Sequence, residues 1–153
     1  MGILIDSVRI SGFRGINDLE VLLPRITVLL GINNSGKTSF LKALHLAIGN
    51  YSRQLSEEDF YIDSDGKRVH QILVDIRIIA VDSEYNRVES FEDAWQAEFG
   101  DKIKAEANGF QYLALRTCSK QNSIRGGFET TRATLEKWPD KRNWQTERVR
   151  QTQ

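Results

Sequence analysis

An eight-residue motif at residues 31–38 constrains the fold of this chain more than any other sequence feature. It reads Gly-Ile-Asn-Asn-Ser-Gly-Lys-Thr and matches the pattern G-x-x-x-x-G-K-S/T at every fixed position. An aliphatic and β-branched run, residues 26–30, precedes the motif, and the apolar residues of 37–48 mark one helical face after it. The pattern has structural meaning only between a buried strand and a helix. The sequence therefore predicts a central strand, a glycine-rich loop and an amphipathic helix, in this order.

The residue types of the motif predict a phosphate-binding loop. Gly31 and Gly36 permit the unusual dihedrals and the close backbone approach that such a loop requires. Inward-facing N–H groups and a helix N-terminus supply donors and a favourable dipole for a triphosphate. We expect Lys37, the candidate catalytic residue, to contact the β- and γ-phosphates of the triphosphate and the Thr38 hydroxyl to ligate Mg²⁺. The rest of the predicted cofactor-binding loop is Asn33, Asn34, Ser35 and Ser39, of which Asn34 and Ser39 make secondary contacts at best.

Composition indicates one ordinary soluble domain. The chain has 153 residues, of which 40% are hydrophobic and 27% charged, and it is long enough to bury a single core. Its 21 Lys and Arg balance 21 Asp and Glu, so no chain-wide field attracts nucleic acid or an anionic membrane. A lone Cys118 excludes an internal disulfide framework, and no apolar run approaches the ~18 residues of a membrane span. We expect a cytoplasmic protein without a membrane partner.

Hydrophobic periodicity predicts further strands and one helix. Apolar residues alternate over 3–10, before a turn around Phe13 and Arg14, and a second strand is expected over 19–23. Residues 69–81 have period two, which is typical of a strand with one face partly wet. The other predicted elements are a helix over 91–99, strands over 110–117 and 127–135, and a turn over 122–127.

An acidic stretch over residues 50–66 is predicted to be a surface connection. Ser56 and Asp59 have the spacing that caps a short helical turn, and Asp65-Gly66 favours a hairpin turn. We interpret Glu57, Glu58 and Asp59 as a solvated acidic turn.

Residues 8–44, VRISGFRGINDLEVLLPRITVLLGINNSGKTSFLKAL, resemble the start of ABC-type ATPase heads of the RecF/SMC class, and most closely of the OLD family of ATP-dependent endonucleases. The resemblance is specific over about the first third of the chain. It implies an α/β P-loop NTPase fold in which residues 1–136 form part of an ABC-type head. Its strands and Walker A helix would occupy 1–50, and an antiparallel β-subdomain would occupy about 67–136.

The same resemblance implies that Arg14, directly after Phe13, lies near the nucleotide phosphates. A solvated turn arginine is the alternative interpretation of this residue. The segment over 137–153 is polar and basic, and we expect a poorly ordered tail or linker there. Its tryptophans, Trp138 and Trp144, could alternatively pack against DNA.

Several parts of a complete ABC-type site are not recognisable in the sequence: the signature motif, the Walker B strand that ends in Asp-Glu, and the Toprim nuclease domain of OLD proteins. Residues 78–82 imitate the Walker B strand, but Ser83 rather than Glu follows Asp82. We interpret them as a strand that reaches a turn. The chain is therefore expected to be the front portion of a longer ATPase, or a short relative that does not hydrolyse ATP alone.

The function implied by the resemblance is ATP binding within an ATPase that regulates DNA cleavage, as in phage or plasmid defence. ATP and Mg²⁺ are the implied cofactors, and the heads are expected to form a homodimer or larger assembly, with DNA bound in the full-length context. Two alternatives remain open. The chain could be a complete small P-loop NTPase in which Asp82 holds Mg²⁺, or a non-enzymatic module that binds a full-length ATPase through its β-subdomain.

Overall fold

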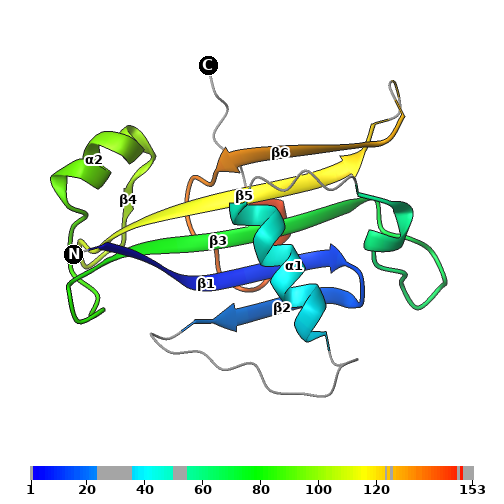
Figure 1. Ribbon diagram of the computed structural model, residues 1–153, viewed down its shortest axis with the longest axis horizontal. Coiled ribbons are helices and arrows are strands. Elements are labelled where there is room, and N and C mark those ends of the chain that lie inside the picture. The colour runs from blue at the N-terminus through cyan, green and yellow to red at the C-terminus, as the bar shows by residue number, and fades with distance from the viewer. Residues whose placement is uncertain are drawn as a thin grey trace.

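One antiparallel sheet forms the centre of the computed structural model (Figure 1). The structure describes residues 2–23, 36–49, 55–122, 124, 126–147 and 149. In these residues the sheet has six strands. Five of them follow the order β2-β1-β3-β5-β4, and the sixth, β6, also pairs with β5. The strands are β1 (Gly2–Phe13), β2 (Ile16–Leu22), β3 (Gln71–Val81), β4 (Lys104–Ala105), β5 (Gln111–Gln121) and β6 (Phe128–Thr134).

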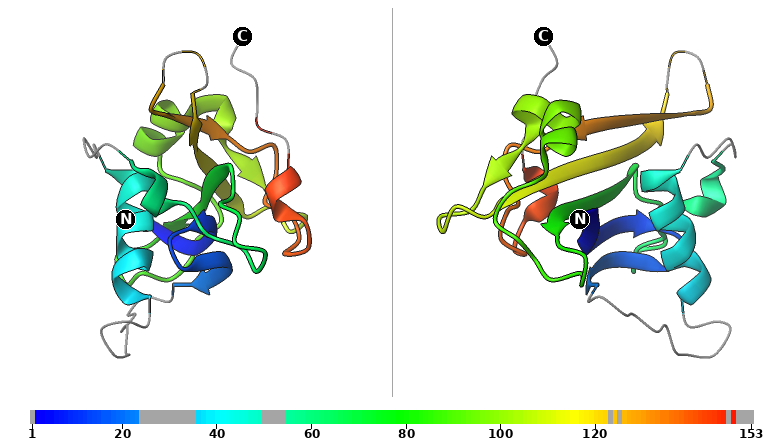
Figure 2. Two further views of the ribbon diagram at one scale, coloured as in Figure 1. Left: turned by 90° about the vertical axis from the view of Figure 1, so that its right-hand side faces the viewer. Right: turned by 60° about the vertical axis from the view of Figure 1, so that its left-hand side comes forward.

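The helices are short and few in the described part of the chain. They are α1 (Lys37–Ile48), α2 (Asp93–Phe99) and the 3-10 turns η1 (Glu57–Asp59), η2 (Gly100–Lys102) and η3 (Trp144–Thr146). Helix α1 lies diagonally across one face of the sheet, and the segment that contains η3 lies against the opposite face (Figures 1 and 2). Among the described helices, none reaches the length and apolarity needed to cross a membrane.

The core lies between α1 and the sheet because residues alternate along the strands. In β3, Ile72, Val74, Ile76 and Ile78 are at most 8% exposed and belong to the same cluster as Phe40 of α1. Side chains two apart share one face of a strand, so these four form a continuous apolar stripe under the helix. Arg132 of β6 fixes the end of α1, since its Nη2 donates to the Leu46 carbonyl over 2.7 Å.

The opposite face of β3 is also buried, which corrects the prediction that it is partly wet. Asp75 is fully buried on this face, and Leu73 and Ile79 are 3% and 6% exposed. Period two distinguishes the two faces of a strand, but it does not reveal a later segment that covers the polar one. Here that segment is 137–147.

Residues 137–147 pack against the sheet and differ in this from a poorly ordered tail. Trp144 is 1% exposed, and its indole Nε1 donates to Asp18 Oδ1 over 2.9 Å. Trp138 lies over the guanidinium of Arg9, whose carbon is 4.4 Å from the ring centre. Both tryptophans thus pack within the protein and cover this face of the sheet, and contact with DNA stays an untested alternative.

A buried ion pair anchors this covering segment. Arg116 of β5 binds both carboxylate oxygens of Asp75, with Nε to Oδ1 and Nη2 to Oδ2 at 2.8 Å each. The same guanidinium donates to the carbonyls of Trp144, Gln145 and Glu147 at 2.8, 3.1 and 3.0 Å. Burial raises the pKa of the Asp75 carboxyl above its ordinary value, and Arg116 opposes that rise. The pair therefore connects the sheet to residues 144–147.

Most predicted elements agree with the structure within a few residues. Strands are present over 2–13, 16–22, 71–81 and 128–134, and Asn122 N–H donates to the Gly127 carbonyl in the predicted turn. Strand β1 pairs with both β2 and β3, so the segments 1–50 and 67–136 contribute to one sheet. The predicted strand over 26–30 lies outside the described residues, and the P-loop class therefore stays a prediction.

We predict that Arg116→Met lowers the free energy of unfolding by about 3–5 kcal/mol at neutral pH, because it leaves the Asp75 charge buried and unpaired. Without Arg116, the folded-state pKa of Asp75 rises further above its unfolded value. The folded state of the variant then binds a proton more tightly than its unfolded state. The difference in unfolding free energy between Arg116→Met and the unchanged chain therefore narrows as the pH falls through this raised pKa. Urea unfolding at several pH values measures both effects.

Arg77→Met is the matched control. Its partner Asp6 is 17% exposed and can be solvated when the arginine is removed, so we expect a loss nearer to about 1 kcal/mol. Equal losses for the two variants, or a deficit for Arg116→Met that does not change with pH, would contradict the assignment of Asp75 as a buried charge.

Candidate phosphate-binding site

The start of α1 has the features of an anion-binding helix terminus. Gly36, the residue before the helix, has φ 93° and ψ 0°, a left-handed conformation that glycine adopts without strain. Phe40 N–H donates to the Gly36 carbonyl and begins the helical ladder. The N–H groups of the first turn have no partner within an α-helix, and here no side chain caps them and no acidic residue lies in the first turn. The first turn of α1 therefore places no carboxylate of its own at the positive end of the helix dipole.

The structure describes part of the predicted loop. Gly31, Asn33, Asn34 and Ser35 lie outside the described residues, and so does the side chain of Lys37, the first residue of α1. In the first turn, Thr38 is exposed and Ser39 is half-buried. Thr38 is therefore a solvent-exposed residue in the first turn of the helix.

Arg14 occupies the turn between β1 and β2 and is anchored there. Its backbone has φ 52°, which is uncommon for a residue other than glycine. Its backbone N–H donates to the Asp59 carbonyl over 2.8 Å, and its Nε donates to Asp59 Oδ1 over 3.1 Å. The side chain of Arg14 remains 23% exposed. Arg14 is therefore a fixed cation rather than a freely solvated one, and its place near phosphates stays a prediction.

Asp59 is the residue that sequence reasoning missed. The prediction of a solvated position is wrong for it, because Asp59 is 1% exposed, whereas Glu57 and Glu58 are exposed as expected. Its Oδ2 accepts the Ser56 N–H over 3.0 Å, which confirms the predicted capping relation. The spacing of Ser56 and Asp59 was a signal for that contact, but the pairing with Arg14 joins residues 45 positions apart and leaves no local pattern.

The chain around Asp59 is held against the β1–β2 turn by backbone contacts. Tyr61 N–H donates to the Gly12 carbonyl over 2.9 Å, and Phe13 pairs with Phe60. Gly12 has φ 77°, and a Cβ there would lie 2.5 Å from the Gln71 carbonyl oxygen. A side chain at this position would therefore push the strands apart. The backbone bonds from Tyr61 to Gly12 and from Arg14 to Asp59 place Asp59 beside Arg14.

Asp82 is the candidate Mg²⁺ ligand in the alternative hypothesis of a complete small P-loop NTPase, and it lies in a turn after β3. Its Oδ1 accepts the backbone N–H groups of Glu84 and Asn86 at 2.9 Å each. The bond from Asn86 lowers the pKa of the Asp82 carboxyl. Asp82 thus stabilises its own turn, in agreement with a strand that reaches a turn. Across the described ranges no group of three or more His, Cys, Asp or Glu is arranged to hold a metal ion.

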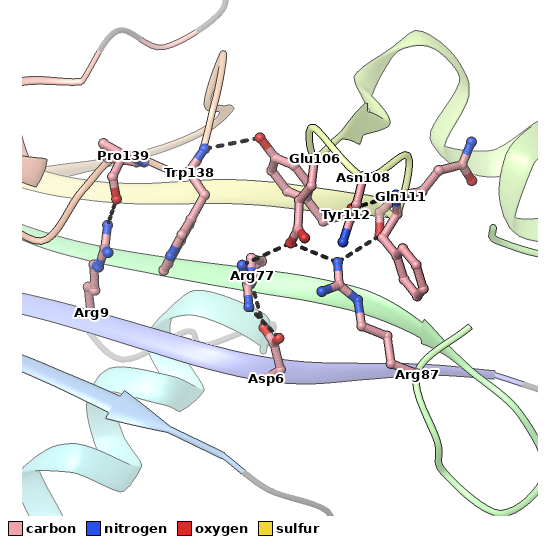
Figure 3. Close-up of polar contacts among 11 residues, drawn as sticks. Asp6, Arg9, Arg77, Arg87, Glu106, Asn108, Gln111, Tyr112, Trp138 and Pro139 are labelled. Atoms are coloured by element: carbon pink, nitrogen blue, oxygen red, sulfur yellow. Dashed lines mark hydrogen bonds and ion pairs between the residues drawn. The ribbon is translucent and has the colours of Figure 1, made fainter. Parts of the chain in front are cut away.

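A second polar cluster, on the face opposite α1, has balanced charge (Figure 3). Arg77 binds Asp6 through Nε and Nη2, at 2.9 and 2.6 Å, and Glu106 accepts from both Arg77 and Arg87. Trp138 lies beside Arg9 and Arg77 in this view. Two arginines, Arg77 and Arg87, meet two carboxylates, so this cluster offers no net charge to an anion.

The chain belongs to the family described as "Protein of unknown function (DUF2813)", whose model matches residues 3–147. Among curated proteins it is similar to "Uncharacterized protein YbjD" of Escherichia coli (strain K12), with 38% identity over 72 residues. The match covers 44% of this chain and 13% of that relative, so it spans a small part of the longer protein's length.

We predict that Gly36→Ala lowers the free energy of unfolding by about 1 kcal/mol through backbone strain, since a Cβ there meets no atom of the described residues within 4 Å. Gly15→Ala is the control, because Gly15 has equal space and no positive φ. It should leave the stability unchanged or slightly raised. A loss of the same size in both variants, measured by urea unfolding, would show that the left-handed conformation of Gly36 is not required.

Proposed function

We propose that this chain is the ATP-binding, Walker A part of an ATPase similar to the OLD family, in which ATP controls DNA cleavage, as in phage or plasmid defence. The observation that carries the proposal is the start of α1. A left-handed Gly36 precedes a first turn with no side-chain cap and no carboxylate, at the position where the motif G-x-x-x-x-G-K-S/T meets the helix. This arrangement supports anion binding, because uncapped N–H groups and the helix dipole act on the same ligand.

The residues at this helix start fit a magnesium nucleotide. In the proposed site the Thr38 hydroxyl would ligate Mg²⁺, and Lys37 would neutralise phosphate oxygens as a mobile point charge. Arg14, fixed on the β1–β2 turn, would supply a second cation, and its side chain is 23% exposed. Bound Mg²⁺ would neutralise part of the negative charge on the phosphate oxygens. Adenine is part of the proposal through the resemblance alone.

Hydrolysis is proposed to need parts beyond this chain. Activation of water requires a carboxylate that is free to accept a proton or orient the water. Asp82 is bonded to its own turn, and Asp59 is bonded to Arg14 and Ser56. We therefore propose that the head acts in a homodimer or larger assembly, and with DNA in a longer protein, rather than as a complete small NTPase.

Calorimetric titration of the chain with ATP and Mg²⁺ tests the proposal. We predict measurable affinity, negligible turnover, and at least about a tenfold loss of affinity in Lys37→Ala, because one charge-assisted contact to the phosphates is removed. Lys42→Ala is the matched control, since it removes the same charge from the same helix five positions further on and should bind ATP as the unchanged chain does.

The possible results separate the proposal from its alternatives. No affinity for ATP would overturn it and favour a module that binds a full-length ATPase. A clear ATPase rate that Lys37→Ala abolishes would overturn the requirement for further parts and favour a complete NTPase.

A further inference from the structure

Three arginine–aspartate pairs of the described chain differ in how much of the guanidinium they occupy. Arg116 and Arg77 each bind their aspartate through both Nε and Nη2. Each of these two nitrogens donates to a different oxygen of the same carboxylate. Arg14 binds Asp59 through Nε alone, at 3.1 Å. The second oxygen of Asp59 accepts the Ser56 N–H instead. One of the three pairs is therefore open.

In the open pair the bond to Asp59 holds Arg14 through Nε, so Nη1 and Nη2 take no part in this ion pair. Asp59 is buried and is tied to Arg14 twice, through its carboxylate and through its backbone carbonyl. Within the described ranges, the bond to Asp59 is the one that the structure gives for the Arg14 guanidinium, which also lies 5.4 Å from the Phe13 ring. The Nη1 and Nη2 groups of arginine form the planar pair of donors that matches two phosphate oxygens.

We infer that Asp59 is a positioning residue, which holds Arg14 by Nε so that both Nη groups are presented to the phosphates of the nucleotide. This inference rests on the proposed function. Asp59 itself touches no phosphate, and its carboxylate would repel one. Its contribution to binding is made through Arg14, by reducing the rotamer entropy that a long side chain loses when it contacts a ligand.

A double-mutant cycle on the full chain tests the inference, with Mg²⁺-ATP as the titrant. Arg14→Ala should weaken ATP binding about tenfold, as the loss of one bidentate cation contact predicts. Asp59→Asn keeps an oxygen for the Ser56 N–H but removes the charge that holds Arg14, and it should weaken binding several-fold. In the double variant the loss should equal that of Arg14→Ala alone, because Asp59 has no route to the nucleotide except through Arg14.

A purely structural role of Asp59 predicts a different pattern. It would lower ATP affinity by the same factor whether residue 14 is arginine or alanine, since a disturbed turn does not depend on the Arg14 side chain. Losses that add in the double variant therefore overturn the inference. Unchanged affinity in Asp59→Asn, with Arg14→Ala weakened, overturns it as well.

A control variant and a control ligand show whether the effect of Asp59→Asn is specific to the terminal phosphates. Asp6→Asn alters the equivalent partner of Arg77 on the opposite face and should leave ATP affinity unchanged, with any effect confined to the unfolding curve. Titration with AMP should show little effect of Asp59→Asn, because an arginine directed at the terminal phosphates has no contact with a monophosphate. If the unchanged chain binds no ATP, the proposed function fails together with the inference, whereas an ATP-binding chain without coupling leaves the function intact.

Discussion

Burial of both faces of β3 is the constraint on which the rest of the structure depends. One face carries an apolar stripe that packs under α1, and the other carries Asp75 and Arg77, which are charged. A charged side chain in a buried layer needs a partner with matching geometry. Arg116 supplies it for Asp75, and the same guanidinium then holds the carbonyls of residues 144–147. The covering segment and the polar face therefore stabilise one another.

Charged residues are arranged differently on the face opposite α1 and at the start of α1. On the face opposite α1, arginines and carboxylates neutralise each other and support Trp138 and Trp144 as a cover. At the start of α1 no acidic residue lies in the first turn, and Arg14, on the β1–β2 turn, is bonded to Asp59 through Nε. The first arrangement is neutralised within the protein, whereas the second supports the anion site that we propose.

Local signals predicted much of the fold. Alternation predicted a strand over 69–81, which corresponds to β3, and the candidate strand over 110–117 corresponds to the first part of β5. Asp65-Gly66 predicted the turn over 63–67, and the spacing of Ser56 and Asp59 predicted the start of η1. Each of these depends on residues a few positions apart. The pairing of Asp59 with Arg14, by contrast, brings together a turn and a 3-10 helix that are distant in sequence, and the cover over Asp75 comes from a polar segment whose tryptophans could equally have faced solvent.

The sequence by itself determined the position of the glycine-lysine-threonine motif at the start of a helix, because backbone freedom at Gly36 and the helical spacing after it are local properties. It also determined the strand periodicity, since alternation is written into neighbouring residues. The tertiary structure alone decided which charges are buried and with what partners. Desolvation depends on every element packed around a group, and only the folded chain brings Asp59 to Arg14 and residues 144–147 to Arg116.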